Sequence, residues 1–429
     1  MEHIIKNFDR LAISPLRRQT LIIAEEGFRA INTGQVFAQS LCYDGKKDIL
    51  TIQGQKLDLK KFSRVFVLAF GKAALDSAKA LESLLNGRII QGYVIDVEEG
   101  ALPKKYSVTA GSHPLPSQKN IIATKEAVEG LSRLTETDLV ICAVSGGGSS
   151  LFTWPYELPP EAVAELFRAL TKQGADINEL NTVRKHIDRV KGGNLAKLFY
   201  PATVINLLFS DVPGDDLSII ASGPAVKDKT TVHDASAILK KFDALEACGL
   251  HSVNLFETPK EEKYFTDVKN YLLLSPMTAL RAMKEKAEDL GFDAKIFSDR
   301  FQGQARALGA EIVAQAKKHQ CLLGAGESTV KIAGKGKGGR NQEMALGALE
   351  NIKDSQVLVC LASDGYDNTD AAGAVVDYFT KAKAKRLGLE PKKFLDDNDS
   401  YRFFEKTDDL VFTGLTESNV SDFFILLEQ

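Results

Sequence analysis

Three consecutive glycines follow an apolar run in this sequence and provide bare backbone where an anion could bind. The string AVSGGGSS occupies residues 143–150, directly after the strand-like run LVICAV. Glycine has no Cβ, so it allows a close approach to the main chain. Such a turn either simply ends a strand or presents a cradle of N–H groups to a phosphate, and this segment alone leaves both open. The residues predicted to bind a nucleotide or phosphate here are Ser145, Gly146, Gly147, Gly148, Ser149 and Ser150.

The turn matches no standard nucleotide or hydrolase signature. A P-loop requires a lysine after its last glycine, and none follows here. Leu151 stands where the dinucleotide pattern G-x-G-x-x-G and the nucleophile elbow G-x-S-x-G each require a glycine. The chemistry therefore depends on what other segments bring to this turn.

Two basic segments are candidates for binding an anion. Lys72 follows the strand-like run 64–70 at the start of a helix, where it either holds a phosphate or is a solvated lysine. The string GKGKGGRNQEMAL at 334–346 places glycines and cations at a helix entrance, where free N–H groups and formal charge favour an anion. A mobile hairpin tip is the alternative for its lysines. Gly339 is predicted to bind phosphate, Arg340 to be catalytic, and Asn341 to bind substrate.

Aspartates gather in two further turns. Asp211 ends a strand, and Asp216 follows it in the string SDVPGDD; both are predicted to bind Mg²⁺, which prefers hard oxygen ligands. For Asp216 the alternative is that it caps the next helix. A second set comprises Asp364, Asp367 and Asp370, from which Asp364 is predicted to be catalytic.

A polar stripe follows the predicted helix 178–198. Asn181, Arg184, Asp188 and Lys191 recur at helical spacing, and Gly192-Gly193 interrupts the helix. A solvated helix face would explain this stripe equally. We predict that Asn181 and Arg184 bind substrate, and that either Arg184 or Arg340 holds a carboxylate with its two-pronged guanidinium.

The elements that must position these residues alternate between strand and helix. Apolar runs at 64–70, 92–97, 139–144 and 203–209 are separated by segments of helical period, which predicts a parallel, doubly wound sheet. A second α/β segment begins near residue 270, and its run TVKIAG suggests a mixed sheet. We therefore predict two α/β lobes, 1–245 and 246–429, with the active cleft between them.

Composition excludes several classes of protein. The chain has 429 residues with 54 basic and 57 acidic side chains, which argues against a nucleic-acid surface made by bulk charge. No apolar run approaches a membrane span, and the N-terminus lacks the pattern of a signal peptide. Five scattered cysteines indicate core packing in a reducing compartment, so we expect a cytoplasmic protein. The oligomeric state stays open, and a homo-oligomer is compatible with the sequence.

The strings together resemble the glycerate 2-kinase family, whose members carry a C-terminal MOFRL domain. The matching stretches run in family order from about residue 65 to the C-terminus: GKAALDSAKAL, GSHPLPS, SGGGSSL, LNTVRKHIDRVKGGNLA, SDVPGDDLSIIASGP, GGRNQEMAL, SDGYDNTDAAGA and TGLTESNVSDFFILL. The resemblance implies an ATP- and Mg²⁺-dependent kinase that phosphorylates the 2-hydroxyl of D-glycerate, with Lys72 and Arg340 as the basic residues of its cleft. It also implies a Rossmann-like N-terminal lobe and a smaller C-terminal lobe. Three turns depart from the family pattern: GAGEST, SDGYDNTDAAG, and the segment with Glu417 and Ser418 in place of Gly-Thr.

Phosphoryl transfer requires an aligned hydroxyl and neutralisation of charge. Lys72 and Arg340 would neutralise charge, and Asp211 with Asp364 would handle metal or proton; which aspartate accepts the hydroxyl proton stays open. One alternative is a hydroxypyruvate reductase, although no dinucleotide fingerprint follows a strand. The other is a non-catalytic binder of a phosphorylated metabolite, which the carboxylates would repel unless a metal were present.

Overall fold

The computed structural model describes residues 3–212, 214–416 and 420–429, and the chain forms two compact units. The central unit is Val36–Leu273, and the terminal unit combines Met1–Gln35 with Leu274–Gln429. Each is described by itself. Pro213 of the aspartate-rich turn, and Glu417 and Ser418 of the unusual C-terminal turn, lie outside the described residues.

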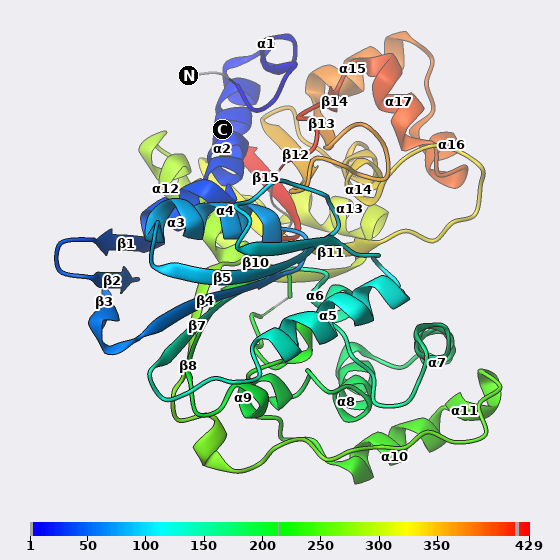
Figure 1. Cartoon of the computed structure of the whole chain (residues 1–429). Helices are drawn as coiled ribbons and strands as arrows, with labels where there is room; N and C mark the ends of the chain where they lie inside the picture. Colours follow the sequence, from blue (N-terminus) through cyan, green and yellow to red (C-terminus); the bar gives the residue numbers. More distant parts are fainter. Residues whose placement is uncertain (1–2, 213, 417–419) are drawn as a thin grey trace. The chain divides into compact units, whose positions relative to one another are not determined.

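The central unit contains a six-stranded sheet in the order β6-β5-β4-β7-β8-β9 (Figure 1). The pairs β4–β5, β4–β7, β5–β6 and β7–β8 are all parallel, which confirms the predicted doubly wound sheet. Its inner strands β4, β7 and β8 are near-continuous apolar runs because helices cover both faces of such a sheet. The strands are β4 (Arg64–Phe70), β5 (Ile89–Asp96), β6 (Tyr106–Ala110), β7 (Asp138–Val144), β8 (Thr203–Phe209) and β9 (Val268–Leu274). A separate antiparallel sheet joins β1 (Leu41–Asp44), β2 (Ile49–Ile52) and β3 (Gln55–Asp58).

The strand order places a topological switch point between β4 and β7. The chain passes from β4 outward to β5 and β6, then returns to β7 on the other side of β4, where Phe70 pairs with Val144. The turns that follow these two strands therefore lie side by side, one carrying Lys72 and the other the three glycines. In open α/β sheets, ligands bind at such a point.

Eight helices of the described residues accompany these strands. They are α4 (Ala74–Leu85), α5 (Gln118–Gly130), α6 (Gly148–Leu151), α7 (Pro160–Lys172), α8 (Ile177–Ile187), α9 (Asn194–Phe199), α10 (Val232–Lys241) and α11 (Ala244–Ala247). The predicted helix 178–198 is divided: α8 ends at Ile187, and Asp188 is extended and forms a β-bridge with Pro155. The polar stripe expected along one continuous helix is therefore wrong, because the chain turns before Lys191.

The terminal unit has a mixed six-stranded sheet in the order β10-β11-β15-β12-β13-β14. Only β10 and β11 pair in parallel within it; the other neighbours are antiparallel. A mixed sheet was predicted, although TVKIAG contributes only Thr329 to a strand. The strands are β10 (Asp293–Gln304), β11 (Gln320–Thr329), β12 (Gln356–Ala362), β13 (Gly373–Asp377), β14 (Leu410–Val411) and β15 (Asp422–Glu428).

Helices pack on both faces of this sheet. The helix α14 packs with α13 and α17 into one apolar core. The helices α2 and α12 pack on one another; α2 contacts β12 and β15, and α12 contacts β10 and β11. The remaining helices are short or peripheral. The helices of this unit are α1 (Phe8–Leu11), α2 (Pro15–Ala30), α12 (Pro276–Asp289), α13 (Ala305–Gln315), α14 (Arg340–Ala348), α15 (Tyr378–Arg386), α16 (Pro391–Asp396) and α17 (Ser400–Thr407), while α3 (Thr33–Ser40) spans the division between the units.

The compact units differ from the predicted division at 245/246. The first 35 residues belong with the C-terminal segment because α2 packs on β12 and β15. Arg17, 1% exposed, reinforces this packing: its Nε donates to Asp377 Oδ2 at 2.6 Å and its Nη1 to Asp409 Oδ1 at 2.8 Å. At the other boundary, β9 completes the central sheet, so residues 246–273 belong to the central unit.

Candidate active site

The glycine turn after β7 has the form of an anion cradle. Gly147 has φ of 80°, a left-handed conformation that favours glycine. The N–H groups of Gly146, Gly147 and Ser149 donate to no other described residue, whereas the N–H of Gly148 donates to the Ser145 carbonyl at 3.2 Å. Three unpaired N–H groups in one turn provide donors for an anion.

The adjacent turn after β4 fits tightly against it. Gly71 has φ of 115°, and a Cβ there would lie 2.2 Å from Ser145 Oγ, so no larger residue fits. The Lys72 N–H donates to the Gly146 carbonyl at 2.9 Å, and Ser145 Oγ accepts from the Ala73 N–H at 3.0 Å. These bonds fix the two turns to one another.

The Lys72 side chain is exposed, and no negative charge in the described part of the chain balances its ammonium. No carboxylate of a described residue lies within ion-pair distance of its ammonium. Its Cγ lies 3.3 Å from the position that a Cβ on Gly147 would occupy. A cation at the start of a helix is unfavourable unless an anion is also bound, which supports the functional interpretation of Lys72 over a solvated lysine.

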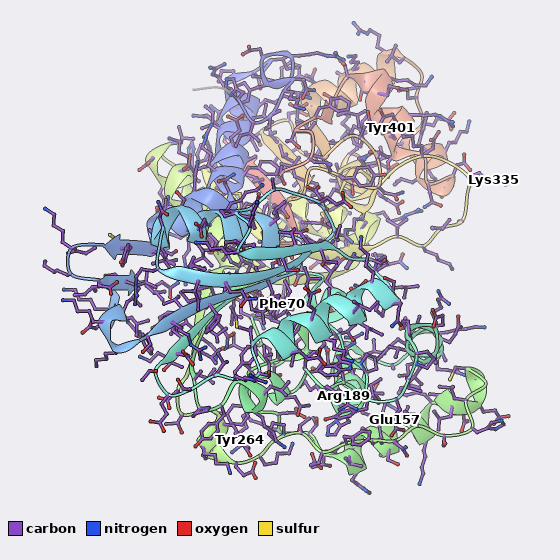
Figure 2. The ribbon with its side chains drawn as sticks, in the orientation of Figure 1. Phe70, Glu157, Arg189, Tyr264, Lys335 and Tyr401 are labelled. Carbon is purple, nitrogen blue, oxygen red and sulfur yellow. The ribbon has the colours of Figure 1, made fainter. Side chains whose placement is uncertain are left out.

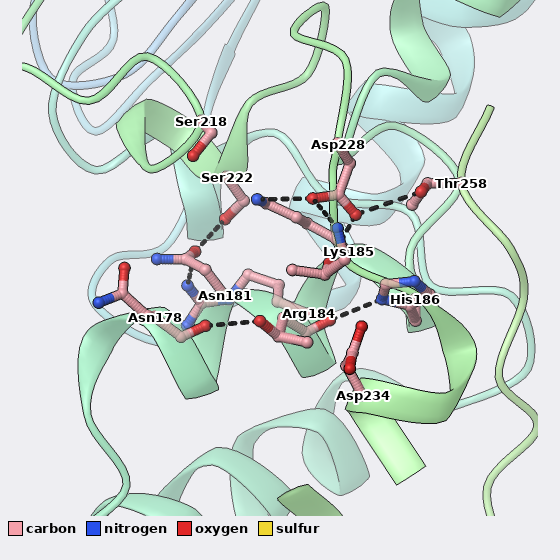
Figure 3. Close-up of polar contacts among 12 residues, drawn as sticks. Asn178, Asn181, Arg184, Lys185, His186, Ser218, Ser222, Asp228, Asp234 and Thr258 are labelled. Atoms are coloured by element: carbon pink, nitrogen blue, oxygen red, sulfur yellow. Dashed lines mark hydrogen bonds and ion pairs between the residues drawn. The ribbon is translucent and has the colours of Figure 1, made fainter. Parts of the chain in front are cut away.

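A chain of hydrogen bonds connects the glycine turn to α8. Ser149 Oγ lies 2.9 Å from Ser222 Oγ, which donates to Asn181 Oδ1 at 2.8 Å. Arg184 Nη1 donates to the same oxygen at 3.1 Å (Figure 3). Asn181 is 2% exposed, so it orients Arg184 and is not available for direct contact with a substrate in this conformation.

Arg184 is half-buried and lines a cavity of about 180 Å³. Its guanidinium lies 4.4 Å from the centre of the Phe167 ring. Burial lowers the pKa of Arg184 to about 10, and the charge of Asp188 opposes that shift. The guanidinium stays protonated at neutral pH and could hold a carboxylate. Gly147, Ser149 and Ser150 line the same cavity, so the glycine turn and Arg184 face one space.

Lys191 and Asp188 are buried behind the glycine turn, although a solvated helix face was one interpretation of the stripe to which they belong. Lys191 is 0% exposed and its Nζ donates to the Gly148 carbonyl at 3.1 Å and to the Phe152 carbonyl. Burial lowers its pKa to about 7. Asp188, 1% exposed, accepts from Thr153 Oγ1 and from two backbone N–H groups. Both side chains hold the segment that carries the glycine turn.

The neighbouring polar cluster in Figure 3 is structural. Lys185 Nζ donates to Asp228 Oδ1 at 3.1 Å, and Thr258 Oγ1 donates to Asp228 Oδ2 at 3.2 Å. His186 is fully buried, and its Nδ1 lies 2.8 Å from the Thr182 carbonyl oxygen. These contacts anchor α8.

Of the aspartates predicted to bind metal, Asp211 lies at the glycine turn. A Cβ on Gly146 would lie 2.3 Å from Asp211 Oδ2, so the carboxylate rests directly on this glycine. Asp216 is exposed and accepts from the Ser218 N–H at 2.8 Å. That bond favours the alternative interpretation of Asp216 as a capping residue of its turn.

In the terminal unit, the first amides of the segment before α14 are already engaged by side chains. The N–H groups of Ala333 and Gly334 donate to Asn398 Oδ1, at 2.7 and 3.0 Å, and the Lys335 N–H donates to Asp397 Oδ1 at 3.0 Å. Lys335 itself is exposed on this loop (Figure 2). The N–H groups of Gly338, Gly339 and Arg340, directly at the helix entrance, donate to no other described residue, so the anion site at this entrance stays a prediction.

The start of α14 is also occupied. Asp367 accepts from the N–H groups of Asn341 and Gln342, at 3.1 and 2.9 Å. Gly339 is required for this approach, since a Cβ there would lie 2.0 Å from the Asp367 carbonyl oxygen. Gly339 therefore accommodates Asp367, and its predicted contact with a phosphate stays a prediction. Asn341 is 0% exposed, and its predicted contact with substrate stays a prediction.

Arg340 is engaged by two carboxylates. Its Nε donates to Asp422 Oδ2 at 2.5 Å, its Nη2 to Asp422 Oδ1 at 3.2 Å, and its Nη1 to Glu327. Asp422 is 0% exposed, and burial raises its pKa to about 7 even though Arg340 lowers it. These residues line a cavity of about 670 Å³ in the terminal unit.

The second aspartate set is dispersed. Asp364 is half-buried and accepts from the Tyr366 N–H at 3.0 Å, whereas Asp370 is exposed and pairs with Lys337 at 3.3 Å. Asp367 is buried under α14, so these three carboxylates do not form one site. No group of three or more metal-binding side chains occurs among the described residues.

Comparisons with known proteins identify the family to which the chain belongs. A family described as a domain of unknown function (DUF4147) matches residues 19–254, and the MOFRL family matches residues 320–422. Glycerate 2-kinase of Pyrococcus horikoshii is 39% identical over 417 residues, covering 89% of this chain and 90% of that protein. The chain belongs to the glycerate kinase family.

A solved structure agrees with this glycerate kinase family assignment, and a further relative carries a different name. The crystal structure of glycerate kinase from Thermotoga maritima has a TM-score of 0.84 at 33% identity, over 96% of this chain and 99% of that chain. A putative hydroxypyruvate reductase of Agrobacterium vitis is 35% identical over 85% of this chain and 87% of that protein. Across the part of this family member that the structure describes, no helix combines the length and apolar character required to cross a membrane.

Proposed function

We propose that the chain is an ATP- and Mg²⁺-dependent kinase that transfers a phosphoryl group to the 2-hydroxyl of D-glycerate, giving 2-phosphoglycerate. One observation carries the chemical part of this proposal: the uncompensated ammonium of Lys72 lies beside a turn with unpaired N–H groups at the switch point of the sheet. The names of the relatives, glycerate 2-kinase and D-glycerate 2-kinase, support the substrate.

The central unit supplies the main requirements of phosphoryl transfer. Lys72 and the N–H groups of the glycine turn would neutralise charge on the transferring phosphoryl group. Arg184 would hold the substrate carboxylate and so align the hydroxyl. The cavity beside it, about 180 Å³, is smaller than pockets that hold drug-sized ligands, and this size favours a three-carbon acid over a nucleotide.

Asp211 fits the role of a magnesium ligand. Mg²⁺ binds in proteins through one or two carboxylates together with substrate phosphates, so a single well-placed aspartate suffices. The Asp211 carboxylate lies on Gly146, next to the unpaired N–H groups. Bound there, the ion would neutralise phosphate charge. The predicted roles of Arg340 and Asp364, which belong to the terminal unit, stay predictions.

One assay decides between kinase and reductase. Purified protein is incubated with D-glycerate, ATP and Mg²⁺, and ADP is measured; a parallel reaction contains hydroxypyruvate and NADH. We expect ADP formation that requires D-glycerate and Mg²⁺. Oxidation of NADH without formation of ADP would instead support the reductase.

Asp211→Asn is expected to weaken the use of metal. Losing one charged ligand corresponds to about 1.5–3 kcal/mol, so the Mg²⁺ concentration for half-maximal activity should rise about 10- to 100-fold. Titration of activity with Mg²⁺ measures this shift, and Asp216→Asn is the matched control that should leave it unchanged. An unaltered Mg²⁺ dependence in Asp211→Asn would remove Asp211 from the site.

A further inference from the structure

The small cavity of the central unit is lined by three ionisable side chains, and two of them are not available to accept a proton from a substrate. Asp188 already accepts hydrogen bonds from Thr153 and from the backbone N–H groups of Trp154 and Val190. Arg184 is a cation and cannot accept a proton. The third ionisable side chain is His113.

His113 lies directly on the glycine turn. A Cβ on Gly147 would lie 3.0 Å from His113 Cδ2 and 3.2 Å from Nε2. The imidazole forms no hydrogen bond or ion pair with another residue of the described chain. The other side-chain oxygens of the cavity are engaged: Ser149 pairs with Ser222, and Ser150 donates to the Gly147 carbonyl. His113 is thus the acceptor that remains available.

The surroundings of His113 favour its neutral form. Although the residue as a whole is exposed, partial desolvation of the imidazole lowers its pKa below the ordinary value of 6.5, and the charge of Lys72 lowers it further. Lys72 approaches from the turn after β4, and Arg184 and Asp188 face the same cavity from the segment around α8. A neutral imidazole can accept a proton at physiological pH, whereas a protonated one cannot.

We propose that His113 contacts the 2-hydroxyl of the substrate and accepts its proton during phosphoryl transfer. This role rests on the proposed kinase function. In the step, the O–H bond of the hydroxyl breaks and its proton moves to a ring nitrogen of His113. The hydroxyl oxygen bonds to the γ-phosphorus of ATP, and the bond from that phosphorus to the β–γ bridging oxygen breaks, releasing ADP. Arg184, bound to the carboxylate of the substrate, would hold the 2-hydroxyl next to the His113 imidazole.

His113→Asn tests the role, because asparagine keeps a hydrogen-bonding side chain but cannot take up the proton. We expect kcat to fall about 100-fold, within the range for loss of a general base. The wild-type profile of kcat/KM should fall on acidification through a pKa below 6.5, since only neutral His113 is active, and this acid limb should be absent in the variant. His233→Asn, at an exposed histidine of the same unit, is the matched control and should behave like the wild type.

A melting temperature measured for each variant separates chemistry from folding. A His113→Asn variant with wild-type melting, reduced kcat and no acid limb supports the role. If kcat stays within twofold of the wild type, or if the acid limb persists unchanged, His113 is not the proton acceptor. A wild-type chain that forms no ADP with D-glycerate contradicts the proposed function itself, so the two failures are distinguishable.

Discussion

Replacing Lys72 by methionine is expected to lower kcat/KM for phosphorylation of D-glycerate by about 100- to 1,000-fold, the effect typical of removing one preorganised donor from a developing charge. Methionine preserves the length and apolar stem of lysine but removes the ammonium. Since that ammonium has no carboxylate partner among the described residues, its loss removes no ion pair of the folded unit. The melting temperature should therefore stay close to that of the wild type.

The matched control for this variant is Lys79→Met. Lys79 lies on α4, the helix that follows Lys72, and its half-exposed ammonium pairs with Asp76 at 3.0 Å. Such surface pairs contribute at most about 1 kcal/mol to stability, so both activity and melting should change little. If Lys72→Met retains wild-type kcat/KM in the same assay, the turn after β4 is not part of the phosphate site.

Arg340→Met should destabilise the terminal unit by about 3 kcal/mol. Removing one partner of a buried ion pair leaves an uncompensated charge, which typically costs 3–5 kcal/mol. The low end of this range applies because the Arg340 side chain is 37% exposed, whereas Asp422 is 1% exposed. Chemical denaturation of the wild type and the variant measures the difference.

A second substitution identifies the cause of this loss. In the double variant Arg340→Met, Asp422→Asn, the buried charge is absent, so about half or more of the lost stability should return. Lys393→Met, which breaks an exposed pair with Glu390, is the control for removing a surface cation. Arg340→Met with unchanged stability and reduced kcat would show that Arg340 acts on substrate and does not mainly hold Asp422.

Local sequence pattern was sufficient to predict the elements that carry the site. The run at 64–70 is β4, the run ending at Val144 is β7, and the turns that follow them meet at the switch point. This succeeded because parallel buried strands are continuous apolar runs, and because glycine is required where two turns pack within contact distance. The interpretation of Lys72 depended only on these neighbouring turns.

Contacts between distant segments explain what the sequence could not predict. Part of the glycine-rich segment before α14 is engaged: Asp397 and Asn398, more than 60 residues later, accept from the amides of Gly334 and Lys335. Asp367 similarly occupies the start of α14. Arg17 joins the N-terminal helix to Asp377, 360 residues away, and no local pattern indicates that pairing. Lys191 would belong to the polar stripe only if the helix continued past Ile187, but the chain leaves the helix at Asp188.

The most direct test of the account is the identity of the product formed from D-glycerate, ATP and Mg²⁺. Proton-coupled phosphorus NMR distinguishes the two isomers, because a phosphate on C2 couples to one proton of the adjacent carbon and a phosphate on C3 couples to two. The account predicts a product resonance that is a doublet, accompanied by equimolar ADP. A triplet, or the absence of any phosphorylated glycerate, would contradict it.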